Sequence, residues 1–414
     1  MKIGMILDSA FPPDPRVENE ALHLIRNNHR VFLFCLDYTH TLPERENIRG
    51  IEVFRYRLPK FVYKLSALAY TTRHYHDHLS AHIIDFILRT RIDALHIHDV
   101  AIARSVVEIG KKYEIPTVLD LHENRPEIMK FYPHVHSMPG KLLIKPETWA
   151  KFESTYIRES DRVIVVTREA KDYYIEKLHI NESKFTVVPN TIRREFYTNY
   201  KTDQEIIKKY RNHYSLLYLG ETGLRRGLLT AIQAVSTLKT RIPEIKLVIV
   251  GKSKTDHILR NKIAELNLEN EVELTGWKDF STFQSYIKAS KLGISPIHQN
   301  IHHNTTYANK IFQYLAFGKP ILVSDCLAQA NIAANYNCGL VFKDQNVTDF
   351  ADKVYQLYTD MDLYLTLASN AIIAIDEHLR WEIQAGELTA LYREIESSEK
   401  IMHFHGTRQL SAHI

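Results

Sequence analysis

Two adjacent arginines lie in a glycine-rich turn near the middle of the chain. The apolar segment Leu216–Leu219 leads into the turn Gly220–Gly227, which contains Arg225 and Arg226, and an apolar stretch with helical character follows. Glycines allow backbone amides to approach a phosphate, the start of a helix attracts an anion, and an arginine can donate two hydrogen bonds to it. Diphosphate binding is one interpretation of this pattern, and a plain strand–turn–helix connection with exposed arginines fits the glycine spacing equally well.

A second polar segment, residues 303–320, precedes the apolar run Ile321–Ser324. Asn304 or Thr305 is expected to cap a helix whose first amides face an anionic ligand. Gln313, two turns further on, can form hydrogen bonds with hydroxyl groups. A capped helix without a ligand would explain the glycine and the proline that end the segment, but not its polar first turn.

Polar residues also follow two apolar runs in the first half of the chain. Asp14 fits a helix N-cap, and Arg16 lies in the first turn, where it could contact a phosphate or an acidic acceptor group. His122 could position a hydroxyl or stabilise a leaving phosphate, because an imidazole titrates near neutral pH. A single histidine is usually structural, but Glu123 beside it and the position at a strand end favour a functional role.

Two series of short apolar runs, separated by amphipathic stretches, place these residues. This alternation is the pattern of parallel strands joined by helices, and it predicts two doubly wound α/β domains. Ligands of such domains bind outside the carboxyl ends of the strands. Residues 191–213 are polar and are expected to link the domains. The expected strands are Met1–Leu7, Val31–Leu36, Ile51–Tyr56, Ala94–Ile97, Thr117–Leu121, Val163–Val166, Phe185–Val188, Leu216–Leu219, Leu247–Val250, Val272–Leu274, Leu292–Ile294, Ile321–Val323 and Leu340–Phe342.

The composition excludes several classes of protein. A chain of 414 residues with 45% apolar residues is long enough for two cores. The net charge of +4 is too small to indicate a nucleic-acid partner. The three cysteines are widely spaced and predict neither a disulfide framework nor a zinc site. No stretch approaches the roughly 20 apolar residues of a membrane span, so we expect a cytoplasmic protein, free or at the inner face of the membrane.

A series of motifs along nearly the whole chain resembles that of glycosyltransferase family four. They are Phe11–Val17, His96–Asp99, Asp120–Glu123, Val188–Asn190, Gly220–Gly227, Asn309–Pro320 and Trp381-Glu382. The resemblance implies the GT-B fold, in which two Rossmann-like, doubly wound parallel-sheet domains face a central cleft. The implied domains are an N-terminal acceptor-side domain at 1–192, a C-terminal nucleotide-sugar-binding domain at 193–380, and a returning C-terminal helix with a tail at 381–414.

The resemblance also implies an activity. Members of the family are retaining, metal-independent glycosyltransferases that need no further cofactor. The implied donor is a nucleotide-diphosphate sugar of the UDP or GDP type, and the sugar is expected to be a hexose. The acceptor hydroxyl is left open, since a saccharide, a lipid-linked glycan or a small metabolite would each fit, and the expected setting is the synthesis of a cell-surface polysaccharide or glycolipid.

Individual roles follow from the positions that match the family motifs. Arg226 matches the residue that grips the donor diphosphate, Gly220 the turn beneath it, and His122 the histidine that faces the transferred sugar. Gln313 and Thr305 match a spaced pair of glutamates, of which the later holds the ribose and the earlier touches the donor sugar. The other donor-side candidates are Arg225, Trp277, Tyr307, Asn309 and Lys310, and the acceptor-side candidates are Asp14, Arg16, His98 and Glu123.

The chain departs from the family pattern at the donor site. Neither position of the glutamate pair is acidic, and Glu221 stands where many members have a second arginine. Arg225 or Lys310 is therefore expected to supply positive charge to the diphosphate. A catalytically degenerate scaffold is one alternative, and a nicotinamide-dependent oxidoreductase is a less favoured one, since its glycine loop usually follows the first strand.

Two clusters of residues allow other interpretations. His74, His76, His78 and His82, and the pair His302-His303, are closely spaced, and we interpret them as solvated surface in preference to a metal site. Residues 54–76 contain five basic and six aromatic residues and no acid, which suits a peripheral membrane contact as well as it suits a variable loop.

Overall fold

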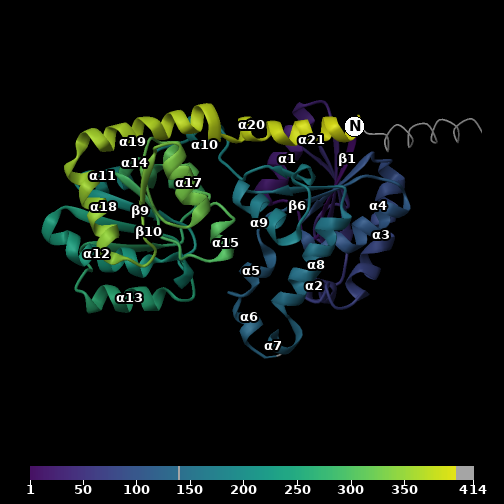
Figure 1. Cartoon of the computed structure of the whole chain (residues 1–414), viewed down its shortest axis with the longest axis horizontal. Helices are drawn as coiled ribbons and strands as arrows, with labels where there is room; N and C mark the ends of the chain where they lie inside the picture. The colour runs from purple at the N-terminus through teal and green to yellow at the C-terminus, as the bar shows by residue number, and fades with distance from the viewer. Residues whose placement is uncertain (139, 398–414) are drawn as a thin grey trace, which may run out of the picture. The chain divides into compact units, whose positions relative to one another are not determined.

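The computed structural model describes residues 1–138 and 140–397, which divide into two compact units (Figure 1). Unit 1 comprises residues 1–189 together with the described residues from 385 onward, and unit 2 comprises residues 190–384. The chain therefore passes between units at Pro189/Asn190 and at Gln384/Ala385, where the sequence predicted 192/193 and 380/381. No helix among the described residues is long and apolar enough to cross a bilayer.

Unit 1 is built on a sheet with the strand order β3-β4-β2-β1-β5-β6-β7-β8. All pairs are parallel except β3 with β4, and the order reverses direction at β1, as in a doubly wound sheet. The strands are β1 (Lys2–Leu7), β2 (Arg30–Asp37), β3 (Arg45–Ile48), β4 (Ile51–Arg57), β5 (Ala94–His98), β6 (Thr117–Leu121), β7 (Arg162–Val165) and β8 (Phe185–Val187).

Helices cover both faces of this sheet, and the strand residues alternate between the two. Leu95 and Ile97 of β5 pack in the apolar core with α3, α4 and α8, whereas His96 points to the opposite face, where it contacts α21. The helices of unit 1 are α1 (Pro15–Arg26), α2 (Lys60–Ser66), α3 (His74–Thr90), η1 (Val100–Ile102), α4 (Ala103–Lys112), α5 (Arg125–Met129), α6 (Pro133–His136), α7 (Gly140–Leu143), α8 (Pro146–Glu159), α9 (Arg168–Leu178), η2 (Glu182–Lys184) and α21 (Gly386–Glu396).

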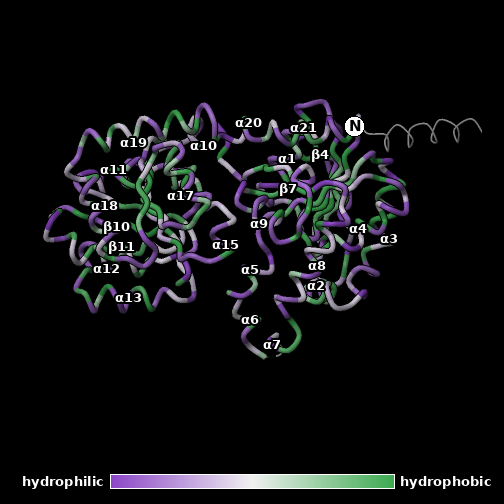
Figure 2. Tube along the Cα trace, in the orientation of Figure 1, coloured by the Kyte–Doolittle hydropathy of each residue, from purple (hydrophilic) through white to green (hydrophobic). Residues whose placement is uncertain are grey.

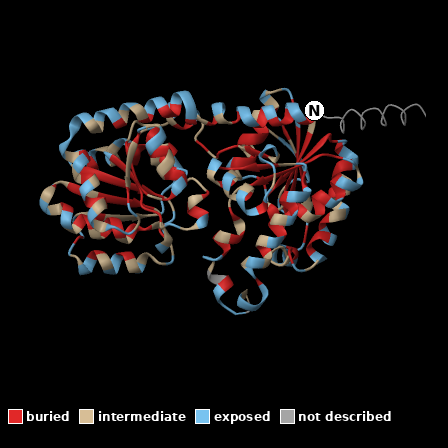
Figure 3. Ribbon diagram, in the orientation of Figure 1, coloured by how far each residue is buried: buried red, intermediate tan, exposed pale blue. Residues whose placement is uncertain are grey.

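Unit 2 has a parallel sheet with the strand order β11-β10-β9-β12-β13-β14. Leu216 and Tyr218 of β9 face one core, with α12, α13 and α18, and Leu217 and Leu219 face another, with α14, α16 and α17. Figures 2 and 3 show the result, since the strands are apolar and buried while the helices alternate along their length. The strands are β9 (Tyr214–Leu219), β10 (Ile245–Val250), β11 (Val272–Gly276), β12 (Leu292–Ser295), β13 (Ile321–Ser324) and β14 (Gly339–Phe342).

The helices of unit 2 begin within the segment that the sequence predicted to be a linker. Residues 191–213 contain α10 and α11, so this part of the expectation was wrong. The helices are α10 (Glu195–Thr198), α11 (Gln204–Tyr210), η3 (Leu224–Arg226), α12 (Leu228–Arg241), α13 (Asp256–Glu265), η4 (Phe280–Thr282), α14 (Phe283–Ala289), α15 (Ile301–Asn304), α16 (Lys310–Leu315), α17 (Leu327–Asn335), α18 (Val347–Thr359), α19 (Met361–Ala374), η5 (Ile375–Leu379) and α20 (Trp381–Gln384).

All the expected strands are present, and two local features differ from the prediction. The added strand β3 is short, polar and exposed at the edge of the sheet, so it has no apolar pattern to identify it. The helix expected to start at Asn304 or Thr305 starts later, and these two residues lie at the end of a separate short helix. Asn300 caps α15, and α16 begins only at Lys310. The Thr305 hydroxyl donates to the carbonyl of Ile301 at 2.8 Å and so ends α15.

Gly293 of β12 provides a test of how unit 2 packs. A Cβ at this position would lie 2.1 Å from the ring of Tyr314, whose hydroxyl accepts a 2.9 Å hydrogen bond from the Leu219 amide. We expect Gly293→Ala to lower the free energy of unfolding by about 2 kcal/mol or more, because the ring has no room to move. Thermal unfolding measures the loss. Gly386→Ala is the control, since its Cβ would meet nothing within 4 Å, and an equal loss there would contradict this account.

Candidate functional site

The guanidinium of Arg16 joins three elements inside unit 1. Its Nε donates to Asp120 at 2.9 Å, its Nη2 to the other Asp120 oxygen at 2.6 Å, and its Nη1 to the carbonyl of Val188 at 3.1 Å. Nη2 also lies 3.0 Å from Glu20, one turn along α1. Arg16 is only 4% exposed and therefore lies inside unit 1. There it links α1 to β6 and to the end of β8.

The charges of this cluster depend on one another. Burial opposes ionisation of Asp120, but Arg16 and then His122 outweigh it and hold the pKa of this carboxyl well below its ordinary value. Glu20 lies 3.0 Å from Arg16 Nη2, farther than Asp120 at 2.6 Å. Burial, together with the nearby Asp120 charge, raises the pKa of Glu20. Burial, and then the neighbouring His96, lower the pKa of His98 to about 3, which makes its imidazole neutral.

Four members of the cluster have the ligand chemistry of a metal site. One atom each from Glu20, His96, His98 and Asp120 lie within 4.8 Å of one another. However, Arg16 already contacts both carboxylates, and a cation would have to displace this guanidinium from a buried place. The residues therefore fit an arginine-centred ion cluster better than they fit a divalent cation.

His122 lies at the open edge of the cluster, at the carboxyl end of β6. Its Nε2 is 3.1 Å from Asp120 and 3.2 Å from Nδ1 of His98, and its side chain is 22% exposed. Burial disfavours the charged ring, but Asp120 more than compensates and raises the pKa of His122 to about 9. At neutral pH this histidine is a positively charged group that can reach a ligand.

Asp99 and Arg125 form a second ion pair at the same strand ends. Arg125 Nη1 donates to Asp99 at 2.6 Å, and the other carboxylate oxygen accepts from the Val100 amide at 2.7 Å. Asp99 has φ 70° and ψ 161°, a conformation almost restricted to glycine. Asp8 adds a second carboxylate beside this pair, and burial raises the pKa of Asp8 although Arg125 opposes the shift.

In unit 2, glycines let the predicted diphosphate turn pass close to its neighbours. Gly220 follows β9 with φ +118°, and its amide donates to Val250 at 2.9 Å. Gly227 has φ +69°, and a Cβ there would lie 1.7 Å from the carbonyl of Pro296. Both positions therefore require glycine, and they hold the short η3 helix with Arg225 and Arg226 at the carboxyl end of β9.

Glu221 is oriented by the turn itself. One of its carboxylate oxygens accepts from the Gly223 amide at 2.7 Å, and the other accepts from Arg226 Nε at 3.1 Å. The acid is thus paired with an arginine of the same turn. This contact reduces the repulsion that an unpaired Glu221 carboxylate would exert on a diphosphate.

Lys310, at the start of α16, completes a group of three cations. Its Nζ lies 3.8 Å above the Tyr218 ring, and a Cβ on Gly220 would be 3.6 Å from its Cε. Lys310 is 9% exposed. Burial, and then the charges of Arg226 and Arg225, hold its pKa well below the ordinary value. An anion at this place would relieve that repulsion.

The remaining donor-side candidates are placed less uniformly. Gln313 is half-buried one turn beyond Lys310, whereas the hydroxyl of buried Thr305 bonds to carbonyls of its own helix. Tyr307 packs edge-on against Phe312, and Asn309 is exposed. Trp277 follows β11, two strands away from β9, and is 64% exposed. Their contacts with a donor stay predictions.

The acceptor-side candidates are also mixed. Asp14 caps α1 through hydrogen bonds from the amides of Arg16 and Val17, as predicted. Arg16 and His98 lie inside the ion cluster, and Glu123 is half-buried beside His122. The sequence did not single out Glu20, although it lies four residues after Arg16 on the inward face of a predicted helix. The pairing of Asp99 with Arg125 had no such periodic signal.

The interpretation of the clustered histidines as solvated surface was partly wrong. His74 and His78 are exposed, but His76 is buried and bonded to Ser105 and to the carbonyl of Ala69. His302 and His303 are buried as well. The apolar stripe of α3 explains the first case, because His76 lies beside Tyr75 and Leu79 on its inward face.

Comparison with known proteins covers nearly the whole chain. The family model described as Glycosyltransferase Family 4 matches residues 16–196, and the one described as Glycosyl transferases group 1 matches residues 199–373.

Individual relatives agree with these models. The chain is 23% identical to an uncharacterized glycosyltransferase of Methanocaldococcus jannaschii, over 95% of this chain and 98% of that one. It is 20% identical to the alpha-monoglucosyldiacylglycerol synthase of Streptococcus pneumoniae, over 86% of this chain and 82% of that one. A solved structure of the Anabaena protein HepE with UDP and glucose is 15% identical, with a TM-score of 0.69 over 95% of this chain and 100% of that one.

The charge of His122 is open to direct measurement. Because its folded pKa lies above the ordinary 6.5, its contribution to stability is complete below pH 6.5 and is lost as the pH rises through about 9. We expect Asp120→Asn to lower the pKa of His122, since burial and Arg16 then oppose the charge and only the smaller effect of Asp99 still favours it. A proton NMR titration of the ring measures it. The exposed Asp172→Asn is the control, and an unchanged pKa in Asp120→Asn would refute the pairing.

Proposed function

The chain belongs to the group 1, family 4 glycosyltransferases with the GT-B fold, and from this premise we propose that it transfers a hexosyl group from a uridine diphosphate sugar. The proposed acceptor is a hydroxyl of a saccharide or lipid-linked glycan, and the anomeric configuration is retained without a metal ion. A guanosine diphosphate sugar is the other candidate donor. The proposed setting is the synthesis of a cell-surface polysaccharide or glycolipid at the cytoplasmic face of a membrane.

The observation that carries this proposal is the group of three cations at the carboxyl end of β9. Arg226 and Arg225 both lie close enough to Lys310 to lower its pKa, and Glu221 is the one acid among the groups that act on Lys310. A diphosphate beside Gly220 would meet this net positive charge. The glycine also lets the backbone amides approach the phosphate groups closely.

The chemistry asked of the protein is electrostatic. As the bond between sugar and diphosphate breaks, negative charge grows on the leaving phosphate, and preorganised cations lower the energy of that state. Arg226 and Lys310 are the proposed stabilising groups. His122, charged at neutral pH, is the proposed partner of the transferred sugar. UDP is preferred as the leaving group because HepE, a structural relative, was solved with UDP and glucose.

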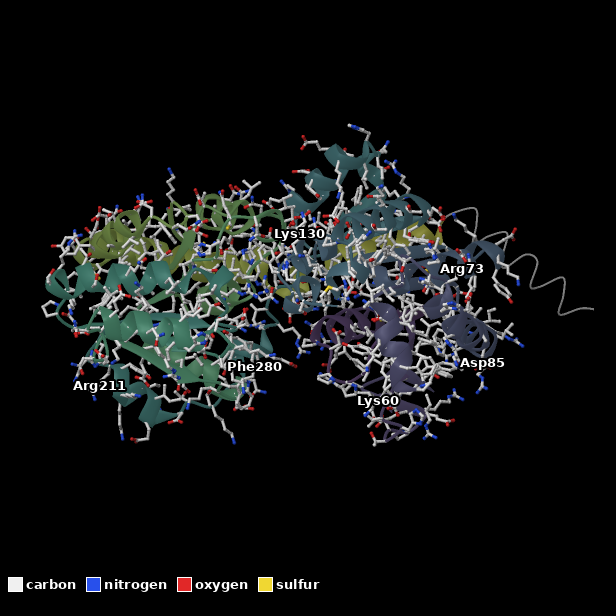
Figure 4. All side chains as sticks on the ribbon, turned by 90° about the horizontal axis from the view of Figure 1, so that it is seen from below. Lys60, Arg73, Asp85, Lys130, Arg211 and Phe280 are labelled. Atoms are coloured by element: carbon white, nitrogen blue, oxygen red, sulfur yellow. The ribbon has the colours of Figure 1, made fainter. Side chains whose placement is uncertain are left out.

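The donor reaction provides the first test. Purified protein is incubated with UDP-glucose, UDP-galactose, UDP-N-acetylglucosamine and GDP-mannose, and released nucleoside diphosphate is measured. We expect release from one donor, and we expect Arg226→Ala to lower kcat by about 100-fold, as for the loss of one charge-stabilising donor group. Arg211→Ala is the control, because this arginine of the same unit is exposed (Figure 4).

Two results would count against the proposal. If no donor releases its nucleotide, the degenerate scaffold becomes the better interpretation. The hydrogen bond from the Thr305 hydroxyl to a carbonyl of its own helix would support it. If release persists in Arg226→Ala, the cation group is not the diphosphate site. NMR of the product gives the anomeric configuration, and inversion would exclude the retaining mechanism.

An exposed apolar surface of unit 1 supports the membrane contact. Residues 131–138 and 140–145, around α6 and α7, project from unit 1 in Figure 1. Met138 and Leu142 are 67% and 64% exposed. Between residues 128 and 146 the chain has three lysines and no acid. Apolar side chains beside lysines are suited to an anionic bilayer. The apolar side chains insert between the lipids, and the lysine ammonium groups stay at the lipid phosphates.

The predicted segment 54–76 contributes only its middle part. Phe54, Tyr70 and Tyr75 are buried, whereas Phe61 and Tyr63 of α2 are exposed. The hydroxyl of Tyr70 accepts from the Lys145 amide at 2.8 Å, which connects this segment to the end of α7. Lys60 and Lys130 are labelled in Figure 4, which views unit 1 from the side where α6 and α7 project.

Flotation with vesicles of phosphatidylcholine, with and without phosphatidylglycerol, tests this contact. We expect binding only to the anionic vesicles. We also expect about a tenfold loss of binding in the double variant Leu142→Ser/Leu143→Ser, since two exposed leucine side chains that become buried in the bilayer contribute at least this much. Leu365→Ser, at an exposed leucine of α19 in unit 2, is the control. Equal binding by the double variant would contradict the assignment.

A further inference from the structure

His303 lies next to Arg225 of the diphosphate turn, although the sequence did not associate it with this turn. It belongs to α15 and is 2% exposed. Its Nε2 is 3.3 Å from Nη1 of Arg225, and its Nδ1 is 2.7 Å from the carbonyl oxygen of His298. The ring is therefore held between a backbone acceptor and a charged donor.

The charge of this ring follows from its surroundings. Burial lowers the pKa of His303 to about 3, and the nearby charges of Arg226, Arg225 and Lys310 act in the same direction. The imidazole is neutral at physiological pH, with one N–H group and one nitrogen lone pair. This is the opposite state to that of His122, which has Asp120 as its neighbour.

Geometry decides which nitrogen carries the proton. A lone pair on Nδ1 would face the His298 carbonyl oxygen at 2.7 Å, and two acceptors repel each other at that distance. Asn300 Nδ2 also lies 3.0 Å from Nδ1, but it donates to the same His298 carbonyl oxygen at 3.0 Å, so we assign the proton to Nδ1, which makes the shorter contact with that carbonyl. Nε2 is left with its lone pair, and it accepts a hydrogen bond from the guanidinium of Arg225.

The segment that carries His303 also holds the backbone of the turn. The His298 amide donates to the carbonyl of Arg225 at 3.0 Å, and Asn300 caps the His303 amide at 2.9 Å. The His298 ring is itself 2.8 Å from Asp344. Both the main chain and the side chain of Arg225 thus contact residues 298–303.

We propose that His303 is a positioning residue of the donor site: its neutral Nε2 orients the guanidinium of Arg225 for the diphosphate without cancelling the arginine's charge. The inference rests on the proposed function, because it takes the diphosphate as the ligand of Arg225. A carboxylate at this place would hold the arginine equally well, but it would neutralise the charge that an anion needs, as Glu221 does in part for Arg226.

The tautomer is tested without any ligand. Nitrogen-15 NMR of histidine-labelled protein distinguishes a protonated from an unprotonated ring nitrogen. We expect His303 to carry its proton on Nδ1 at pH 7. We also expect the Nε2 signal to remain that of an unprotonated nitrogen throughout the range from pH 5 to 8. A proton on Nε2 would overturn the proposal.

The function of the contact is tested by calorimetric titration with UDP. We expect His303→Leu to weaken UDP binding about tenfold, the cost of one hydrogen bond to a charged group. His303→Gln, whose side-chain oxygen can accept from Arg225, should bind within about threefold of the wild type. His302→Leu is the matched control, because this buried neighbour on the same helix should leave UDP binding unchanged.

A double-mutant cycle separates the contact from general damage to the fold. If His303 acts through Arg225, then His303→Leu should weaken UDP binding no further in an Arg225→Ala background. Independent, additive losses would overturn the positioning role. If Arg225→Ala alone leaves UDP binding intact, the inference fails while the proposed function still stands or falls by the Arg226→Ala release assay.

Discussion

The buried ion pair between Arg16 and Asp120 is the constraint on which unit 1 depends. Two parallel hydrogen bonds, at 2.9 and 2.6 Å, join the first helix to the interior strand β6, and both side chains are buried. Charges so deeply buried are tolerated only when their partners are in place, and removal of one would leave the other without compensation. The same pair sets the electrostatics of His122, because Asp120 is the group that keeps this ring charged.

Unit 2 handles its charges in a different way. Arg225, Arg226 and Lys310 are gathered at one strand end with a single acid, Glu221, and burial together with both arginines lowers the pKa of Lys310. The neutral ring of His303 contacts this group without reducing its charge. Two histidines in one chain thus have opposite states, because Asp120 keeps His122 charged against burial, whereas burial, assisted by the nearby Arg226 and Arg225 charges, keeps His303 neutral.

Much of this could be predicted from the sequence, because parallel strands buried on both faces have a strong apolar signal. The runs around Leu217 and Leu119 identified their strands, and the polar residues after them lie at the carboxyl edges, as expected. The break between α15 and α16 could not be predicted, since it depends on a bond from Thr305 to its own helix. The role of His303 also needed coordinates, because the segment 298–303 reaches Arg225 only through the folded chain.

The cluster around Arg16 has a consequence for the connections of unit 1. Arg16 holds the carbonyl of Val188, just before the chain leaves this unit, and His96 lies 2.8 Å from the Tyr392 hydroxyl in the helix by which the chain returns. The outgoing and incoming segments are therefore both anchored to one hydrogen-bonded core. A force on either segment would act on the same few side chains. Loss of this hydrogen-bonded core would therefore loosen the outgoing and the incoming segment together.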